Sequence, residues 1–231
     1  MSADGGDGKS WTVDLAEAAR YLGYKEAPDA VMAERLRAAA RSVTQAARPR
    51  YIYACWPLLV TEGGCELEGA LFLPGASIVR HLSGCGEAFL LAATLGADVD
   101  ALLRRTALTD ILAGVFMDAC ATALVEQVMD GAEAEIQRNR AGEGKEKIYF
   151  TSRFSPGYGD LPLAAQPVVV RLLDAPRRIG LSVTATNILV PRKSVTAVFG
   201  AGTKPRPVCR GAGAASRCLV CPMREECPYK G

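Results

Sequence analysis

The sequence predicts an α+β fold with a largely antiparallel or mixed β-sheet. Segments with helical spacing alternate irregularly with runs of β-branched and aromatic residues, whereas a doubly wound sheet requires a regular alternation of strand and helix. The 231 residues are 49% apolar and 23% charged, which is typical of a globular protein with one large domain or two small ones. No internal repeat occurs along the chain.

The first half of the chain is expected to alternate helices and strands. Asp14 and Asp29 are candidate N-caps of two helices, and Ser77 is the candidate N-cap of a third, because short polar side chains satisfy the first backbone amides of a helix. Aromatic and β-branched residues indicate the strands. The expected elements are a helix at 13–23, a helix between 29 and 48, strands at 51–56 and 66–72, a helix at 77–82 and a strand at 87–94.

The second half contains the longest helix and the last strands. Apolar residues recur at helical spacing over 110–136, and a polar linker follows at 138–147. Pro167 suits the first turn of another helix. The expected elements are helices at 98–105, 110–136 and 167–173, and strands at 148–150, 179–186 and 194–200.

The chain divides into three parts by composition. Residues 1–10 are polar and rich in Gly and Asp, and we expect them to be disordered; residues 11–204 form the α+β domain, and residues 205–231 form a cysteine-rich tail. The start lacks the pattern of a signal peptide and the apolar runs are too short to cross a bilayer, so we expect a cytoplasmic protein without membrane contact. A net charge of +2 and the absence of basic blocks argue against nucleic acid.

Residues 153–162 are the most distinctive loop in the domain. They combine two prolines, two glycines, a serine, an arginine and a tyrosine. Such a run exposes backbone and cannot continue a helix, and taken alone it is more typical of an ordinary turn than of a binding loop. The single histidine, His81, excludes multi-histidine metal sites and histidine-based catalytic triads.

Two segments together resemble a known family. Residues 153–159 read Arg-Phe-Ser-Pro-Gly-Tyr-Gly, and residues 178–197 read Arg-Ile-Gly-Leu-Ser-Val-Thr-Ala-Thr-Asn-Ile-Leu-Val-Pro-Arg-Lys-Ser-Val-Thr-Ala. This pairing resembles the activation (reactivation) domain of cobalamin-dependent methionine synthase, which shows Arg-x-x-x-Gly-Tyr, then a helix, then Gly-x-x-Leu-Thr-Glu-Ser-x-x-Met-x-Pro-x-x-Ser-Val. The resemblance covers roughly residues 85–200. It implies a twisted, mainly antiparallel sheet flanked by helices.

The resemblance implies a function in methionine biosynthesis. A stand-alone activation domain would reactivate a corrinoid protein in trans, by S-adenosylmethionine-dependent reductive methylation of inert cob(II)alamin. The implied partners are a cobalamin-dependent methionine synthase lacking its own activation domain, or another corrinoid protein, together with a low-potential electron donor such as flavodoxin or ferredoxin. The enzyme class implied is a methyltransferase-type reactivase that uses S-adenosylmethionine as substrate.

The resemblance also implies site residues. Arg153 is expected to bind the carboxylate of the methionine moiety, and the backbone of Ser155 and Gly157 to approach the ligand closely. Tyr158 is the candidate catalytic residue, placed to pack on the ligand near the reacting methyl. The family has acidic residues where this chain has Ala185 and, in the preceding helix, Thr122. Two other acidic residues of that helix are therefore the candidates for the ligand ammonium, namely Asp118 and Glu126.

Four cysteines gather in the tail at metal-binding spacing. They read Cys-x8-Cys-x2-Cys-x5-Cys-Pro and are Cys209, Cys218, Cys221 and Cys227. Four thiolates can hold a four-iron four-sulfur cluster or zinc, and disulfides in a secreted protein are a third reading. We favour the cluster, because it could relay the low-potential electron that reactivation needs.

Two other functions fit the same residues. The domain could cap or adapt a corrinoid domain without catalysis, since two of the family's acidic residues are missing. Alternatively, the tail could make the protein an iron–sulfur electron carrier that docks to a corrinoid protein.

Overall fold

The computed structural model describes residues 2–5, 10–142 and 147–204. Within these residues the helices are α1 (Leu15–Tyr21), α2 (Ala30–Ala46), α3 (Ala76–Leu82), α4 (Ala97–Thr109), α5 (Ile111–Gly142), α6 (Gln166–Leu172) and α7 (Ala175–Ile179), with a 3-10 turn at Leu163–Ala165. The strands are β1 (Ser2–Gly5), β2 (Arg50–Val60), β3 (Gly64–Leu67), β4 (Leu71–Pro74), β5 (Glu87–Thr94), β6 (Tyr149–Phe150), β7 (Ser182–Val183), β8 (Leu189–Val190) and β9 (Ser194–Gly202).

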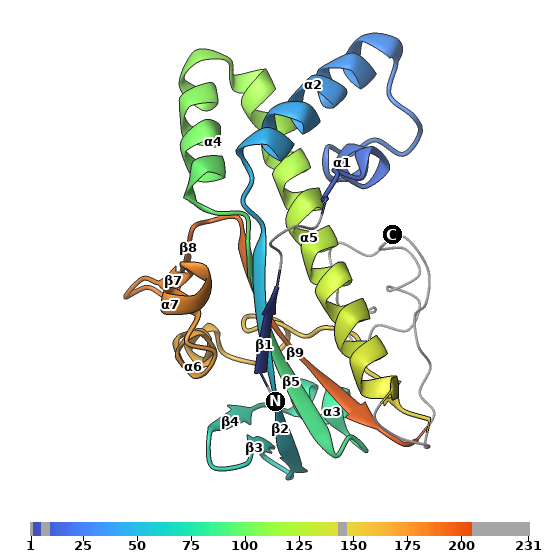
Figure 1. Ribbon diagram of the computed structural model, residues 1–231, viewed down its shortest axis with the longest axis vertical. Helices are drawn as coiled ribbons and strands as arrows, with labels where there is room; N and C mark the ends of the chain where they lie inside the picture. Colours follow the sequence, from blue (N-terminus) through green and yellow to red (C-terminus); the bar gives the residue numbers. More distant parts are fainter. Residues whose placement is uncertain (1, 6–9, 143–146, 205–231) are drawn as a thin grey trace.

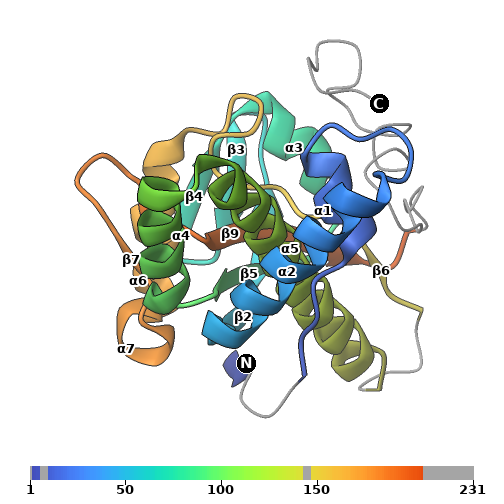
Figure 2. The same ribbon diagram turned by 90° about the horizontal axis from the view of Figure 1, so that it is seen from above.

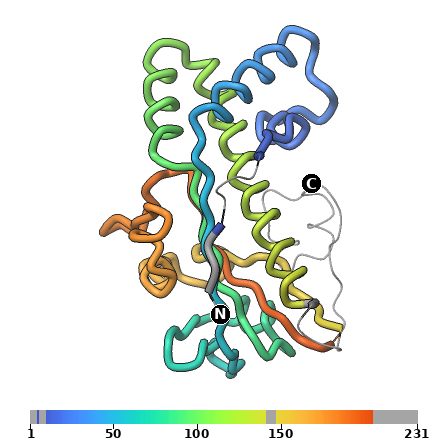
Figure 3. Tube along the Cα trace, viewed as in Figure 1, coloured from blue at the N-terminus to red at the C-terminus, as the bar shows by residue number. Residues whose placement is uncertain are grey.

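The large sheet has the order β4-β3-β2-β5-β9-β6, with β1 added beside β2. Each pairing between its described strands is antiparallel, so the predicted α+β class and mainly antiparallel sheet are confirmed. The central trio brings together distant parts of the chain, as the tube in Figure 3 shows: Leu91 of β5 lies opposite Tyr53 of β2 on one side and Ala197 of β9 on the other. β7 and β8 form a separate small hairpin.

Helices cover both faces of the sheet (Figures 1 and 2). Phe89, Leu91 and Ala93 of β5 pack toward α1, α2 and α5, whereas Leu90 and Ala92 pack toward α3, α6 and α7. Because both faces are buried, β5 is a continuous apolar run rather than an alternating one. One hydrophobic cluster therefore lies on each face of the sheet, between the sheet and the helices that cover that face.

The longest helix, α5, runs across one face of the sheet and contacts α1, α2 and α4 (Figure 1). Residues 111–140 are long and apolar enough to cross a membrane by length and composition alone, but the core helix of a globular protein passes the same test. Its buried side, which includes Cys120, Leu124 and Met129, belongs to the hydrophobic core. α5 thus presents one buried side and one partly exposed side.

Four local predictions differ from the structure. Residues 66–72 are not one strand, because β3 ends at Leu67 and β4 begins at Leu71, with a turn between them. Residues 2–5 form β1 against β2, whereas we expected no regular structure in 1–10. Ser77 is not an N-cap, because it lies inside α3 and the carboxylate of Asp160 accepts from its amide instead. Residues 179–186 are not one strand, since α7 extends to Ile179 and only β7 is extended.

Candidate functional site

The loop at 153–162 begins on the edge of β9 that also pairs with β6. Phe154 donates its amide to the carbonyl oxygen of Val198 and accepts from the Val198 amide, both at 2.8 Å. Thr151 continues the same edge, because its amide donates to the carbonyl oxygen of Gly200. The start of the loop is therefore fixed to the sheet by ladder hydrogen bonds, although it is too short to be a strand.

Aromatic contacts fix the middle of the loop. The buried ring of Phe154 lies 5.0 Å from the His81 ring and 6.0 Å from the Tyr158 ring, the latter edge to face. His81 donates from Nε2 to the carbonyl oxygen of Ser152 at 2.7 Å. Tyr158 itself is 59% exposed. One side of its ring is thus supported by the protein and most of its surface remains accessible.

The glycines give this loop its tight course. Gly157 and Gly159 have φ of 93° and 53°, a region that side chains other than glycine rarely adopt. A Cβ on Gly159 would lie 2.7 Å from the Ser77 hydroxyl oxygen. Gly157 donates to the carbonyl oxygen of Leu161, which closes the loop on itself. The predicted backbone-exposing loop is therefore held close to α3.

Asp160 attaches the end of the loop to α3. Its carboxylate accepts from the backbone amides of Ala76 at 2.7 Å and Ser77 at 3.0 Å, an arrangement that caps the helix from a distant part of the chain. The amide of Ser77, with that of Ala76, lowers the pKa of Asp160 below its ordinary value of 3.8. The carboxylate is exposed, so solvent screens much of this effect.

We expect Asp160→Ala to lower the free energy of unfolding by about 1 kcal/mol at pH 7, because two helix amides lose their acceptor. Only the ionised carboxylate makes the full interaction, so its contribution is present above pH 4 and is lost as the pH falls below about 3.8. Denaturant titrations of both proteins at pH 7 and pH 3 check this. Asp160→Asn should lose less stability, and an undiminished difference at pH 3 would contradict the explanation.

Arg153 is enclosed by three carboxylates of α5. Its guanidinium nitrogens lie 2.9 Å from Glu126, 2.7 Å from Asp130 and 3.1 Å from Glu133, and its side chain is only 9% exposed. Burial by itself lowers the pKa of Arg153, but the charges of Asp130, Glu126 and Glu133 raise it above its ordinary value. The guanidinium therefore remains charged and joins the loop to α5.

A second cation contacts α5 two turns earlier. Lys193, at the turn before β9, lies 2.9 Å from the Asp118 carboxylate and donates to the Thr122 hydroxyl at 2.8 Å. Asp118, Thr122, Glu126 and Asp130 follow one another at intervals of four, so they share one side of α5. This polar stripe faces the start of β9 at one end and the 153–162 loop at the other.

Gln166, in the helix between the two motif segments, links two parts of the second segment. Its amide nitrogen donates to the carbonyl oxygen of Asn187 at 2.7 Å, and its amide oxygen accepts from Thr196 of β9 at 3.2 Å. Because α6 begins at Gln166, the helix between the two motifs connects the β7–β8 hairpin to the sheet. The first motif segment lies beside the same strand, because Phe154 pairs with Val198 of β9.

The structure brings some predicted site residues together and separates others. Arg153 and Glu126 are in contact, with Ser155, Gly157 and Tyr158 in the same loop, whereas Asp118 is paired with Lys193. Sequence reasoning missed Asp130 and Glu133 as partners of Arg153. Their spacing after Glu126 could have revealed them, because it places three carboxylates on one side of the same helix. Three neighbouring carboxylates that are partly buried need a cation beside them.

The cysteine tail lies outside the described residues, so the metal site at Cys209, Cys218, Cys221 and Cys227 remains a prediction. The other cysteines, within the described part, are Cys55, Cys65, Cys85 and Cys120 and form no disulfide. No group of three or more His, Cys, Asp or Glu among the described residues is arranged to hold a metal ion.

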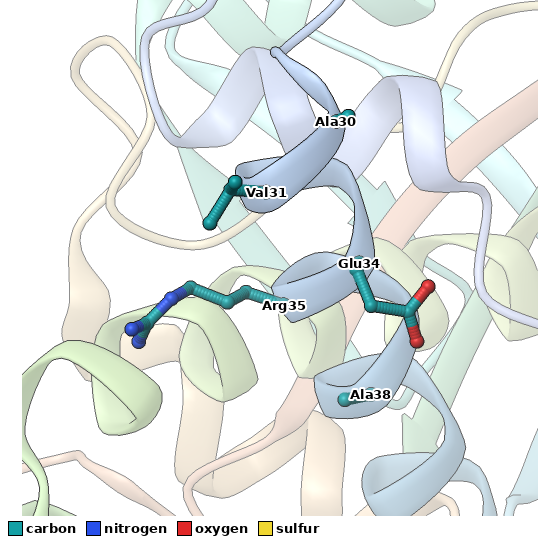
Figure 4. Close-up of a pocket in the computed structure, with 5 residues that line it drawn as sticks. All are labelled: Ala30, Val31, Glu34, Arg35 and Ala38. Atoms are coloured by element: carbon teal, nitrogen blue, oxygen red, sulfur yellow. The ribbon is translucent and has the colours of Figure 1, made fainter.

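Two surface hollows lie away from the loop. The first is on α2 and is lined by Ala30, Val31, Glu34, Arg35 and Ala38 (Figure 4). The second lies at the end of β9 and is lined by Gly84, Cys85, Gly86, Glu87, Arg140, Ile148, Ala201, Gly202, Thr203 and Lys204. Neither includes a residue of the 153–162 loop, so neither marks the predicted site.

Comparison with known proteins identifies the fold. No family model matches the chain, and no curated protein matches it. Among solved structures, the chain is similar to the MetH reactivation domain bound to AdoHcy, with a TM-score of 0.61 and 14% sequence identity over 89% of this chain and 80% of that one. At this identity the likeness concerns the fold. The chain is therefore an α+β protein with the fold of the MetH reactivation domain.

Proposed function

We propose that this chain binds S-adenosylmethionine between the 153–162 loop and the polar side of α5, and uses it to methylate a corrinoid carried by another protein. The observation that carries the proposal is the contact of Arg153 with Glu126, which places an acidic side chain beside the Arg-x-x-x-Gly-Tyr loop. The similar solved domain was bound to AdoHcy, the product that S-adenosylmethionine leaves after losing its methyl group, and this supports the same ligand class.

Charge and shape both suit this ligand. We call Arg153 and its three partners, Glu126, Asp130 and Glu133, the Arg153 cluster. The cluster carries three negative charges and one positive charge, and Asp130 is the most exposed of its carboxylates. S-adenosylmethionine carries a sulfonium and an ammonium against one carboxylate, so a surface with more negative than positive charge favours it. The positive-φ glycine at 157 permits close approach of backbone to ligand, and the exposed face of Tyr158 offers a surface for packing.

The contacts suggest a different role for Arg153 from the one expected. Because its guanidinium is already bound by three carboxylates, we assign it as a positioning residue that fixes Glu126 and the loop relative to each other. Glu126 then binds the ligand ammonium, and the backbone at Ser155 and Gly157 contacts the rest of the ligand. Direct binding of the ligand carboxylate by Arg153 would require it to leave one of its present partners.

The proposed reaction needs no general acid or base from this chain. An external low-potential donor supplies one electron to cob(II)alamin, and the resulting cob(I)alamin donates an electron pair to the methyl carbon. The carbon–sulfur bond breaks with its electrons going to sulfur, which gives S-adenosylhomocysteine and a methylated cobalt. The protein's part is to position the sulfonium methyl and exclude water. No step here depends on a metal in the tail.

We expect Glu126→Gln to weaken S-adenosylmethionine binding by about tenfold or more, since a charge-assisted hydrogen bond contributes about 1.5–3 kcal/mol. Isothermal titration with S-adenosylmethionine measures this, and S-adenosylhomocysteine, which lacks the sulfonium charge, should bind the wild type more weakly. Glu34→Gln, which removes a carboxylate on α2 paired with Arg37 and Arg41, is the matched control. No binding by the wild type would refute the proposal.

A non-catalytic adaptor is the second candidate. The observation that favours it is the full engagement of Arg153 by its three carboxylates, because a capping domain needs this cluster only for its own structure. An adaptor would bind the corrinoid protein equally well with and without S-adenosylmethionine. It would also yield no methylcobalamin when the two proteins are mixed with S-adenosylmethionine and a reductant.

A further inference from the structure

The turn between α4 and α5 exposes a cluster of large apolar side chains. Leu108 is 87% exposed and Ile111 is 77% exposed, and Leu112 and Val115 beside them are about half exposed. We call these four residues the apolar tip. Single exposed apolar residues are common on protein surfaces, but four adjacent ones form a contiguous patch of the kind that marks interaction sites. Figure 1 shows this turn at the top of the α4–α5 hairpin, away from the sheet.

The apolar tip continues the polar stripe of α5. Ile111, Val115, Asp118 and Thr122 follow at intervals of three and four, so they lie on one side of the helix. The same side reaches Glu126 one turn later, where the Arg153 cluster begins. One side of a single rigid helix therefore joins the tip to the proposed S-adenosylmethionine site.

The charges next to the tip are positive on balance, with two arginines against one aspartate. Arg104 and Arg105 are exposed one turn before Leu108 on α4. The nearest carboxylate in sequence is that of Asp110, which accepts from the amide of Ala113 and so caps α5. A surface that fits the tip must combine apolar side chains with acidic ones.

We propose that the apolar tip docks the protein that carries the corrinoid, on a surface of that protein with apolar side chains and an acidic rim. The inference rests on the proposed function, because the docked protein must present its cofactor to the loop at the other end of the same side of α5. A second copy of this chain is a poorer fit, since a two-fold contact would bring Arg104 and Arg105 near their own copies. Among the described residues, Leu108 and Ile111 of the tip are the most exposed large apolar side chains, which suits an anchor.

The test measures binding of a carrier directly. The probe is a MetH chain that lacks its reactivation domain and is loaded with cob(II)alamin. Ile111→Asp should weaken its binding tenfold or more, because a carboxylate replaces an apolar anchor and repels the acidic rim. The variant should fold normally, since aspartate is favourable in the first turn of a helix. Val31→Asp, at an exposed apolar residue in the first turn of α2, is the matched control and should bind as the wild type does.

The outcomes separate the two proposals. Unchanged S-adenosylmethionine affinity and unchanged methylation of free cob(II)alamin in Ile111→Asp, with weakened carrier binding, support docking at the tip. Equal carrier affinity in wild type and variant, or no carrier binding by the wild type, overturns it. A different result is that the wild type forms concentration-dependent dimers or binds anionic vesicles. If Ile111→Asp abolishes either of these, the tip serves that contact and the docking proposal is overturned. Failure of the proposed function is seen separately, as no S-adenosylmethionine binding by the wild type.

Discussion

Replacing Arg153 with methionine should lower the free energy of unfolding by about 3 kcal/mol and abolish S-adenosylmethionine binding. The substitution keeps an unbranched apolar stem but leaves Glu126, Asp130 and Glu133 facing one another without their shared cation. Removing one partner of a buried ion pair costs about 3–5 kcal/mol, and the lower end applies because the carboxylates are partly exposed to water. The ligand site is lost because nothing then fixes the loop to α5.

Urea unfolding at pH 7 and titration with S-adenosylmethionine measure the two effects of Arg153→Met. Arg177→Met is the matched control: Arg177 is exposed and paired with Asp174 on the surface, so its loss should cost less than about 1 kcal/mol. If both arginine variants unfold at the same urea concentration, the Arg153 cluster is not what joins the loop to α5.

Regular elements of this fold could be predicted because their signal is local. β5 was predicted at 87–94 and lies at Glu87–Thr94, since a continuous apolar run buried on both faces differs clearly from its polar flanks. β9 was predicted to begin at Ser194 and does so. α5 was predicted from 110 and begins at Ile111. Each of these elements is long or strongly apolar, so neighbours in the sequence determine it.

Elements that depend on distant contacts could not be predicted in the same way. β1 is polar and is extended because it pairs with β2, about fifty residues away. The cap of α3 comes from Asp160, which is more than eighty residues away in the sequence, so Ser77 was the nearest candidate. For the candidate site, the loop was recognisable from its own residues. Its partners were not, because carboxylates at intervals of three and four on a helix usually face solvent.

The second large effect is expected at Phe154, where the loop is attached to β9. Phe154→Ala should lower the free energy of unfolding by about 3–5 kcal/mol, because it removes a buried ring that contacts both His81 and Tyr158. The backbone hydrogen bonds to Val198 can persist, but the ring that fills the space between β9 and α3 is lost. Thermal or urea unfolding measures the loss, and Phe154→Leu should retain most of the stability.

Tyr158→Ala separates the structural role of this loop from its ligand role. Tyr158 is largely exposed, so removing its ring should cost less than about 1 kcal/mol of stability. The same change should weaken S-adenosylmethionine binding about fivefold or more, since an aromatic contact with the ligand contributes about 1 kcal/mol or more. A large loss of stability in Tyr158→Ala with unchanged ligand affinity would reverse these assignments. It would mean that the ring holds the loop in place and that the ligand, if bound, contacts other residues.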